Sequence, residues 1–198
     1  MNKNWTGNKK SVYSILGSSS HSEEIRQVDD YYATDPNCVN DLIERETFSG
    51  NIWECACGEG HISKRLELLG NHYGINVYSS DKIDRGFGDV IDFLNFEGEW
   101  IGDIITNPPY KYAHEFVNKS LKVIPEGFKV AMFLKVLFLE GQKRKQLFIN
   151  NPPKIIYIYS KRKECAKNGV FTGISSAVAY AWYIWEKGYK GDSVIKWI

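Results

Sequence analysis

Asn107-Pro108-Pro109-Tyr110 directly follows an apolar run at residues 101–106 and combines a stiff turn, hydrogen-bond acceptors and an aromatic ring. The side-chain oxygen of Asn107 and the carbonyl oxygen of Pro108 can accept both hydrogens of an amino group on an aromatic base. This frees the nitrogen lone pair to attack a methyl group carried by a positive sulfur. The two prolines limit reorganisation of the acceptors, and Tyr110 offers a face on which an extruded base can stack. The loop therefore predicts methylation of an exocyclic amino group, which requires neither a metal nor a general base.

A second copy of the first three residues, Asn151-Pro152-Pro153-Lys154, provides an internal comparison. This copy lacks the aromatic residue and precedes a predicted strand instead of following one. Asn, Asp or Ser before Pro-Pro-aromatic is expected by chance in fewer than about 1% of chains of this length. We interpret the second copy as a turn and residues 107–110 as a site.

A glycine-containing segment, Glu54-Cys55-Ala56-Cys57-Gly58-Glu59-Gly60, stands where a predicted strand passes into a helix. Gly58 and Gly60 allow a sharp bend and a close approach to a ligand, and an acidic residue such as Glu54 suits a cationic or amino-bearing one. The third glycine of the dinucleotide-binding pattern would fall at Ser63, so this is not that pattern. A Gly-x-Gly pair is equally typical of a plain tight turn.

Acidic residues follow the next predicted strand. Asp81 lies about 20 residues beyond the glycines, where a carboxylate can accept hydrogen bonds from both ribose hydroxyls. Asp92 can bind an adenine amino group, and Phe93 can lie along the adenine ring. Residues 81–103 contain seven acidic residues and two basic ones, a local charge of −5 that suits a positively charged ligand as well as a solvated surface.

From residue 51 onward, short apolar runs alternate with amphipathic stretches, which is typical of a βαβ series. Strands are predicted at residues 51–55, 73–79, 101–106, 128–134, 155–159 and 177–186. Helices are predicted at residues 36–48, 60–69 (ended by Gly70), 112–123 and 141–149. This order predicts an α/β fold: a mostly parallel sheet with helices on both faces and a ligand at the carboxyl ends of its strands.

The length of 198 residues fits one compact domain, which we place at residues 29–198 behind a flexible polar arm at residues 1–28. A hydrophobic content of 43% excludes general disorder, and the net charge of +1 does not by itself indicate a nucleic-acid-binding protein. The longest apolar runs are too short to cross a bilayer, so no membrane partner is expected. The four cysteines, without a secretory signal, predict a cytoplasmic protein with reduced thiols, and their spacing predicts no metal site.

Basic residues collect after the predicted catalytic loop. Residues 135–167 contain nine basic and two acidic residues, a local charge of +7 that suits a phosphate backbone or, alternatively, a solvated lysine-rich surface. We expect Glu140 and Arg144 to line the mouth of a base pocket. Lys161, Arg162 and Lys163 are expected to contact phosphates, and residues 168–176 to form a loop on the target side. Tyr180, Trp182 and Trp185 are predicted to be core residues of the last strand.

This constellation resembles the S-adenosylmethionine-dependent amino-methyltransferases of DNA, most closely the small phage and prophage adenine-N6 enzymes with an Asn-Pro-Pro-Tyr loop. The similarity begins near Asp29 and follows the family's order of motifs. It implies a Rossmann-like class I methyltransferase fold, S-adenosyl-L-methionine as cofactor and DNA as partner. It also implies a catalytic domain without a separate large target-recognition domain. Restriction protection and marking of a phage genome are equally compatible with the sequence.

The resemblance also implies residue roles. Asn107, Pro108, Pro109 and Tyr110 match the catalytic loop. The matching cofactor contacts are Tyr32 and Thr34 at the methionine end, Glu54, Cys55, Ala56, Gly58 and Gly60 in the glycine motif, Asp81 at the ribose, Asp92 and Phe93 at the adenine, and Asn107 itself. Cys55 stands where the family commonly has proline.

Several alternatives remain open. Asn at position 107 favours adenine N6 over cytosine N4, which is conventionally paired with Ser, and adenine in RNA fits the same geometry. Cytosine C5 methylation is disfavoured because the loop lacks a Pro-Cys nucleophile. Glutamine methylation of a protein uses a similar loop, but the basic segment argues against it. A non-catalytic nucleic-acid-binding module that retains the fold is the alternative from a different functional class.

Overall fold

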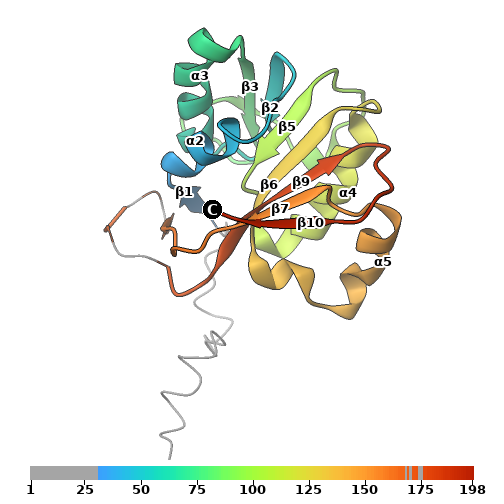
Figure 1. The fold of residues 1–198 in the computed structure, drawn as a ribbon. Helices are drawn as coiled ribbons and strands as arrows, with labels where there is room; N and C mark the ends of the chain where they lie inside the picture. The colour runs from blue at the N-terminus through green and yellow to red at the C-terminus, as the bar shows by residue number, and fades with distance from the viewer. Residues whose placement is uncertain (1–30, 168, 170, 174–175) are drawn as a thin grey trace, which may run out of the picture. The chain divides into compact units, whose positions relative to one another are not determined.

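The computed structural model describes residues 31–167, 169, 171–173 and 176–198 (Figure 1). The predicted polar arm at residues 1–28 lies outside the described residues, as does part of the predicted loop at residues 168–176. Among the described helices, none combines the length and apolarity needed to cross a bilayer.

The helices and strands predicted from residue 51 onward are present in the predicted order, together with three short strands that the sequence did not predict, at Asp89–Val90, Cys165–Lys167 and Val194–Trp197. The strands are β1 Tyr32–Thr34, β2 Asn51–Glu54, β3 Asn76–Asp81, β4 Asp89–Val90, β5 Asp103–Thr106, β6 Lys129–Lys135, β7 Ile155–Ile158, β8 Cys165–Lys167, β9 Tyr180–Glu186 and β10 Val194–Trp197. The α-helices are α2 Asn37–Ile43, α3 His61–Tyr73, α4 Ala113–Val123 and α5 Gln142–Asn150. Short 3-10 helices are η2 Phe93–Asn95, η3 Tyr110–Tyr112 and η4 Val136–Leu139.

Eight strands form one sheet in the order β10-β7-β9-β6-β5-β2-β3-β4. Every neighbouring pair is parallel except those made by β9, which runs antiparallel between β6 and β7. The chain passes from β2 to β3 on one side and later returns to β5 on the other. The carboxyl ends of β2 and β5 therefore meet at a topological switch point, the usual ligand site of such sheets.

Helices cover both faces of this sheet, which confirms the predicted Rossmann-like α/β architecture. Strand residues alternate between the two faces, so Trp53 of β2 packs with α4 while its neighbour Ile52 packs with α2 and α3. The strand predicted at residues 177–186 was expected to be core. It corresponds to β9, which is buried along its length except at Glu186. These two apolar layers hold the strand ends, and hence the loops that follow them, in fixed positions.

The prediction that Gly70 ends a helix is wrong. Helix α3 continues to Tyr73 and ends at Gly74, which adopts a left-handed conformation with φ of 66°. Gly70 is needed for close packing instead, because a Cβ atom there would lie 2.4 Å from the carbonyl oxygen of Ile75. Strand β3 consequently begins at Asn76, three residues later than predicted.

The helix predicted at residues 36–48 is also shorter than expected. Helix α2 ends at Ile43, and the chain then extends so that Glu46 pairs with Lys129 of β6 at 2.8 Å. The hydroxyl of Tyr157 in β7 donates to the same carboxylate at 2.7 Å. These non-local contacts favour an extended segment where local periodicity favoured helix.

A separate two-stranded ribbon joins β1 to β8 in antiparallel register, with Tyr32 opposite Lys167 and Thr34 opposite Cys165. No sequence pattern predicted this pairing. It brings the start of the described chain against the carboxyl edge of the main sheet.

Candidate active site

Asn107 lies immediately beyond β5, and β1 holds its side chain in one orientation. Its Nδ2 donates to the carbonyl oxygen of Tyr32 and to Thr34 Oγ1, both at 2.9 Å. A backbone carbonyl can only accept, so the contact with Tyr32 fixes which end of the amide is nitrogen. Within the described part of the chain, Asn107 Oδ1 is buried and has no hydrogen-bond partner.

An unpaired buried acceptor is costly. Leaving such a group unsatisfied costs about 1–3 kcal/mol, and native proteins keep few of them. Asn107 thus has its nitrogen fully engaged and its oxygen free to accept a hydrogen bond. This is the donor and acceptor arrangement that the predicted chemistry requires.

Tyr110, three residues further on, is partly buried among other side chains at this edge. Its ring lies 5.7 Å from that of Tyr32 and 5.9 Å from that of Tyr180, measured between centroids. The Lys135 ammonium lies 4.5 Å from the ring centroid, and the Tyr110 hydroxyl is 3.5 Å from Cys165 Sγ. Burial raises the pKa of Tyr110 well above its ordinary value, so the hydroxyl stays protonated.

Gly58 and Gly60, in the loop after β2, have φ angles of 56° and 80°, the left-handed region that favours glycine. A Cβ atom on Gly58 would lie 2.3 Å from the Tyr31 ring, and one on Gly60 would lie 2.5 Å from the Phe87 ring. Both glycines are therefore required by backbone conformation and by close approach. The loop is a true bend walled by two aromatic rings.

Asp81 ties the end of β3 to this loop. Its Oδ2 accepts from the backbone N–H of Gly58 and its Oδ1 from that of Ile83, each at 2.9 Å. The carboxylate thus lies next to the glycine bend.

Glu54 is buried at the end of β2 and accepts a hydrogen bond from the Ser63 hydroxyl. Ser63 in turn accepts from the Ser79 hydroxyl at 2.7 Å. Loss of solvent raises the pKa of Glu54 well above its ordinary value, with nearby Asp81 adding to the effect. Ser63 and Ser79 were not among the predicted site residues, although Ser63 occupies the place of the third glycine of the dinucleotide-binding pattern.

Glu54→Gln is expected to leave the protein at least as stable as the wild type at pH 8. The raised pKa means that the folded state favours the protonated carboxyl. This contribution is complete below the unfolded pKa of about 4.3 and is lost as the pH rises through the folded pKa. Glutamine mimics the neutral form at every pH. Thermal unfolding should show the variant melting about 2–4 °C or more above the wild type at pH 8, with a smaller difference at pH 4. A lower melting temperature at pH 8 would contradict this assignment.

The two residues predicted to contact the adenine, Asp92 and Phe93, lie in different surroundings. Asp92 accepts from Leu94 N–H at 3.2 Å and Asn95 Nδ2 at 3.0 Å, and it pairs with Lys82 at 2.9 Å. Phe93 is only 1% exposed and packs edge to face on Trp53, so its ring has no accessible face for a ligand. Its position does not support the predicted contact with the adenine ring.

Cys55 is likewise buried, at 1% exposure, and burial raises its pKa well above the ordinary value. Its thiol is therefore held neutral. A neutral thiol is compatible with a buried position at which the family commonly has the uncharged residue proline. Ala56 beside it is partly buried.

Two of the residues predicted to contact nucleic acid are engaged within the protein. The Arg144 guanidinium donates to the carbonyl oxygens of Phe138 at 2.8 Å, Leu137 at 3.2 Å and Glu140. Lys163 pairs with Asp41 at 3.0 Å, and its ammonium lies 4.6 Å from the Tyr159 ring centroid.

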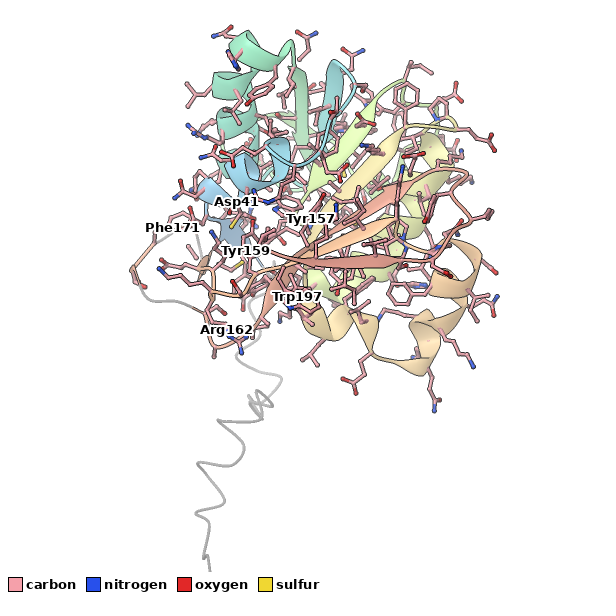
Figure 2. The ribbon with its side chains drawn as sticks, viewed as in Figure 1. Asp41, Tyr157, Tyr159, Arg162, Phe171 and Trp197 are labelled. Carbon is pink, nitrogen blue, oxygen red and sulfur yellow. The ribbon has the colours of Figure 1, made fainter. Side chains whose placement is uncertain are left out.

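The remaining three basic-segment candidates are solvent-accessible. Lys161 and Arg162 are exposed and make no hydrogen bond or ion pair with any other described residue, and Glu140 is also exposed. Arg162 projects outward in Figure 2. The structure therefore brings Asn107 together with β1, and Glu54 and Asp81 together with the glycine loop, but leaves the basic candidates dispersed.

No family model matches this sequence, and a search of curated proteins found no match. Solved structures do match. A protein from Listeria monocytogenes assigned to the class I S-adenosylmethionine-dependent methyltransferases is 13% identical, with a TM-score of 0.59, and the match covers 96% of this chain and 72% of that one. A type I restriction-modification methyltransferase subunit from Streptococcus thermophilus is 11% identical, with a TM-score of 0.60 and coverage of 86% of this chain and 48% of that one.

An N-methyltransferase from Bradyrhizobium japonicum in complex with S-adenosyl-L-homocysteine is 12% identical, with a TM-score of 0.50 and coverage of 78% and 86%. The chain thus spans just under half of the restriction-modification subunit and most of the other two. At these identities the likeness concerns the fold. The chain therefore has the fold of the class I S-adenosylmethionine-dependent methyltransferases.

Proposed function

We propose that the protein transfers a methyl group from S-adenosyl-L-methionine to the exocyclic N6 of adenine in DNA. The observation that carries this proposal is Asn107: its nitrogen is held by two acceptors of β1, and its buried oxygen has no partner among the described residues. The residue stands at the carboxyl end of β5, at the switch point of the sheet.

The chain's own residues would activate the amine. Asn107 Oδ1 and the carbonyl oxygen of Pro108 accept its two hydrogens, which draws the nitrogen out of conjugation with the base and exposes its lone pair. Because Asn107 is already fixed by β1, the acceptor needs no reorganisation when the base arrives. Tyr110, with its ring at the same edge, provides a surface for the extruded base.

The same edge carries carboxyl groups and backbone groups that fit the cofactor. The cofactor would supply a methyl group on a positively charged sulfur. Glu54 and the backbone of Gly58 and Gly60 would hold the methionine end, with Tyr32 nearby on β1. Asp81 would accept the ribose hydroxyls and Asp92 the adenine amino group. Glu54 is buried and favours the neutral form, so an amino group beside it would lower its pKa.

The similarity to solved methyltransferase structures supports the proposal at the level of the fold. One neighbour is a methyltransferase subunit of a restriction-modification system, a class whose substrate is DNA, and another is an N-methyltransferase. Asn at position 107 favours adenine N6 over cytosine N4. The exposed cations Lys161 and Arg162 favour a nucleic acid over a protein substrate.

The proposal can be tested with purified protein and radiolabelled S-adenosylmethionine. Label is expected in DNA, and digestion to nucleosides should place it in N6-methyladenine. Label in N4-methylcytosine would show that the target is cytosine N4 and not adenine N6. Label in RNA alone would show that the substrate is RNA and not DNA. If no nucleic acid is labelled and calorimetry detects no cofactor binding, the enzymatic proposal fails in favour of a non-catalytic module.

We expect Thr34→Val to lower kcat by about two- to tenfold with little change in KM for the cofactor. The Thr34 hydroxyl accepts from Asn107 Nδ2, and losing one neutral hydrogen bond costs about 0.5–1.5 kcal/mol. Valine has nearly the same shape but cannot accept. Thr34→Ser restores the hydroxyl and should recover most of the rate. If the valine variant instead raises KM for the cofactor at unchanged kcat, Thr34 contacts the cofactor and does not position Asn107.

A further inference from the structure

The η4 turn, Val136–Leu139, exposes two leucines on either side of a buried phenylalanine. Leu137 is 60% exposed and Leu139 is 40% exposed, whereas Phe138 is 7% exposed. Single exposed leucines are common on protein surfaces and have no meaning alone. The η4 turn differs from such isolated leucines in three ways. Its backbone is held by core residues, it lies beside the candidate catalytic loop, and positive charge flanks it.

The turn is supported from the core. The Tyr183 hydroxyl lies 3.2 Å from the carbonyl oxygens of both Lys135 and Val136 and donates to them, and Val136 N–H donates to Ala179 at 2.9 Å. The Phe138 ring packs edge to face against that of Tyr183, with 5.7 Å between their centroids. These contacts fix the start of the turn.

Arg144 fixes the other end. Its guanidinium donates to the carbonyl oxygens of Leu137, Phe138 and Glu140 and lies 5.0 Å from the Phe138 ring centroid. A cation predicted to meet the substrate is thus used to hold the backbone of this turn. The result is a stiff loop that keeps the Leu137 side chain in solvent.

The turn also lies beside the candidate catalytic loop. Strands β5 and β6 are parallel neighbours with Thr106 opposite Met132, so the segments that follow them leave the sheet side by side. Lys135, the residue before the turn, places its ammonium 4.5 Å from the Tyr110 ring centroid. The η4 turn therefore starts next to Tyr110, the residue proposed to support the extruded base.

Positive charge flanks these leucines. Residues 135–145 contain Lys135, Lys143, Arg144 and Lys145 against Glu140, a local charge of +3. Lys143 and Lys145, in the first turn of α5, are exposed, and their side-chain ammonium groups form no hydrogen bond or ion pair with any other described residue. An apolar tip with free cations behind it complements a base stack bordered by phosphates.

We propose that the η4 turn is a wedge that opens duplex DNA beside the target adenine, with Leu137 inserted into the base stack. This inference rests on the proposed function, because the amino group of a paired adenine is reached only when the base leaves the stack. Apolar side chains inserted between base steps are a known means of unstacking DNA. A wedge that is already rigid loses little freedom when it is inserted.

The test compares Leu137→Ala with Leu68→Ala, a matched control because Leu68 of α3 is 69% exposed and lies outside this turn. The substrates are a duplex that the wild type methylates and its adenine-containing strand alone. Leu137→Ala is expected to lower kcat/KM on the duplex by about tenfold or more and on the single strand by less than about twofold. In a second readout, 2-aminopurine at the target position should gain fluorescence with the wild type and gain less with Leu137→Ala. Leu68→Ala should match the wild type in both assays.

Equal activity of Leu137→Ala and the wild type on the duplex would overturn the wedge, as would an equal loss on both substrates. A wild type that methylates only single strands would also overturn it while leaving the proposed function intact. A wild type that binds the cofactor but methylates neither substrate would overturn the proposed function, and the wedge with it.

Discussion

Asn107→Ala is expected to lower methyl transfer by at least about 10²- to 10³-fold, the usual loss when one preorganised hydrogen-bonding group is removed from an active site. Alanine leaves Pro108 and Pro109, which stiffen the turn, in place but provides no acceptor for the amine. The proposed role of Asn107 towards the amine lies in the transition state, so cofactor affinity should stay within about tenfold of the wild type even though Asn107 also matches a cofactor contact of the family. Single-turnover kinetics at saturating cofactor, together with calorimetric titration, measure the two quantities separately.

The chain supplies a matched control in Asn151, which stands before two prolines in the second copy of the motif. Asn151 ends α5, where its backbone N–H donates to Leu147 and its carbonyl oxygen accepts from Trp185 Nε1. Alanine preserves both backbone contacts, so Asn151→Ala should retain wild-type activity. Comparable losses in the two variants would mean that the effect of Asn107→Ala is structural.

Asp81→Ala is expected to weaken cofactor binding by about 10- to 100-fold or more, because each hydrogen bond to a charged group contributes about 1.5–3 kcal/mol. The carboxylate also accepts from Gly58 and Ile83, so its removal loosens the glycine loop as well. At saturating cofactor, kcat should recover to within a few-fold of the wild type. This is the opposite pattern to that of Asn107→Ala.

Asp84→Ala is the control for this experiment. Asp84 follows in the same loop, but its carboxylate contacts only the Gly86 N–H at 2.9 Å among the described residues. Its replacement should leave the calorimetric affinity unchanged. If Asp81→Ala binds the cofactor as tightly as the wild type, Asp81 stabilises the loop without contacting the ligand.

The sequence was sufficient to predict features that depend on neighbours along the chain. Alternating apolar runs predicted the sheet and its helices, and Asn107 and Asp81 could be placed at strand ends because each follows such a run. Strands β5, β2 and β3 are parallel, with β2 in the middle, so their carboxyl ends lie along one edge of the sheet and place Asn107 and Asp81 there. Glu54 was placed correctly for the same reason.

Features that depend on distant contacts were not predictable in this way. Thr34 reaches Asn107 only because β1 pairs with β8, whose Cys165 is far along the chain. Phe93 follows Asp92, which was predicted to face the cofactor, yet packing against Trp53 draws Phe93 into the core. Arg144 lies in a basic segment and was therefore predicted to contact nucleic acid. Its guanidinium instead donates to three carbonyl oxygens, because a nearby turn offers unsatisfied acceptors.

The most direct test of the central claim is a crystal structure of the protein with S-adenosyl-L-homocysteine. With hydrogen bonds of about 2.9 Å and reacting atoms about 3–3.5 Å apart, the sulfur should lie within about 7 Å of Asn107 Oδ1, with open space between them for an amino group. The ribose hydroxyls should lie against Asp81. A nucleoside bound elsewhere, or a sulfur separated from Asn107 by other side chains, would contradict the account.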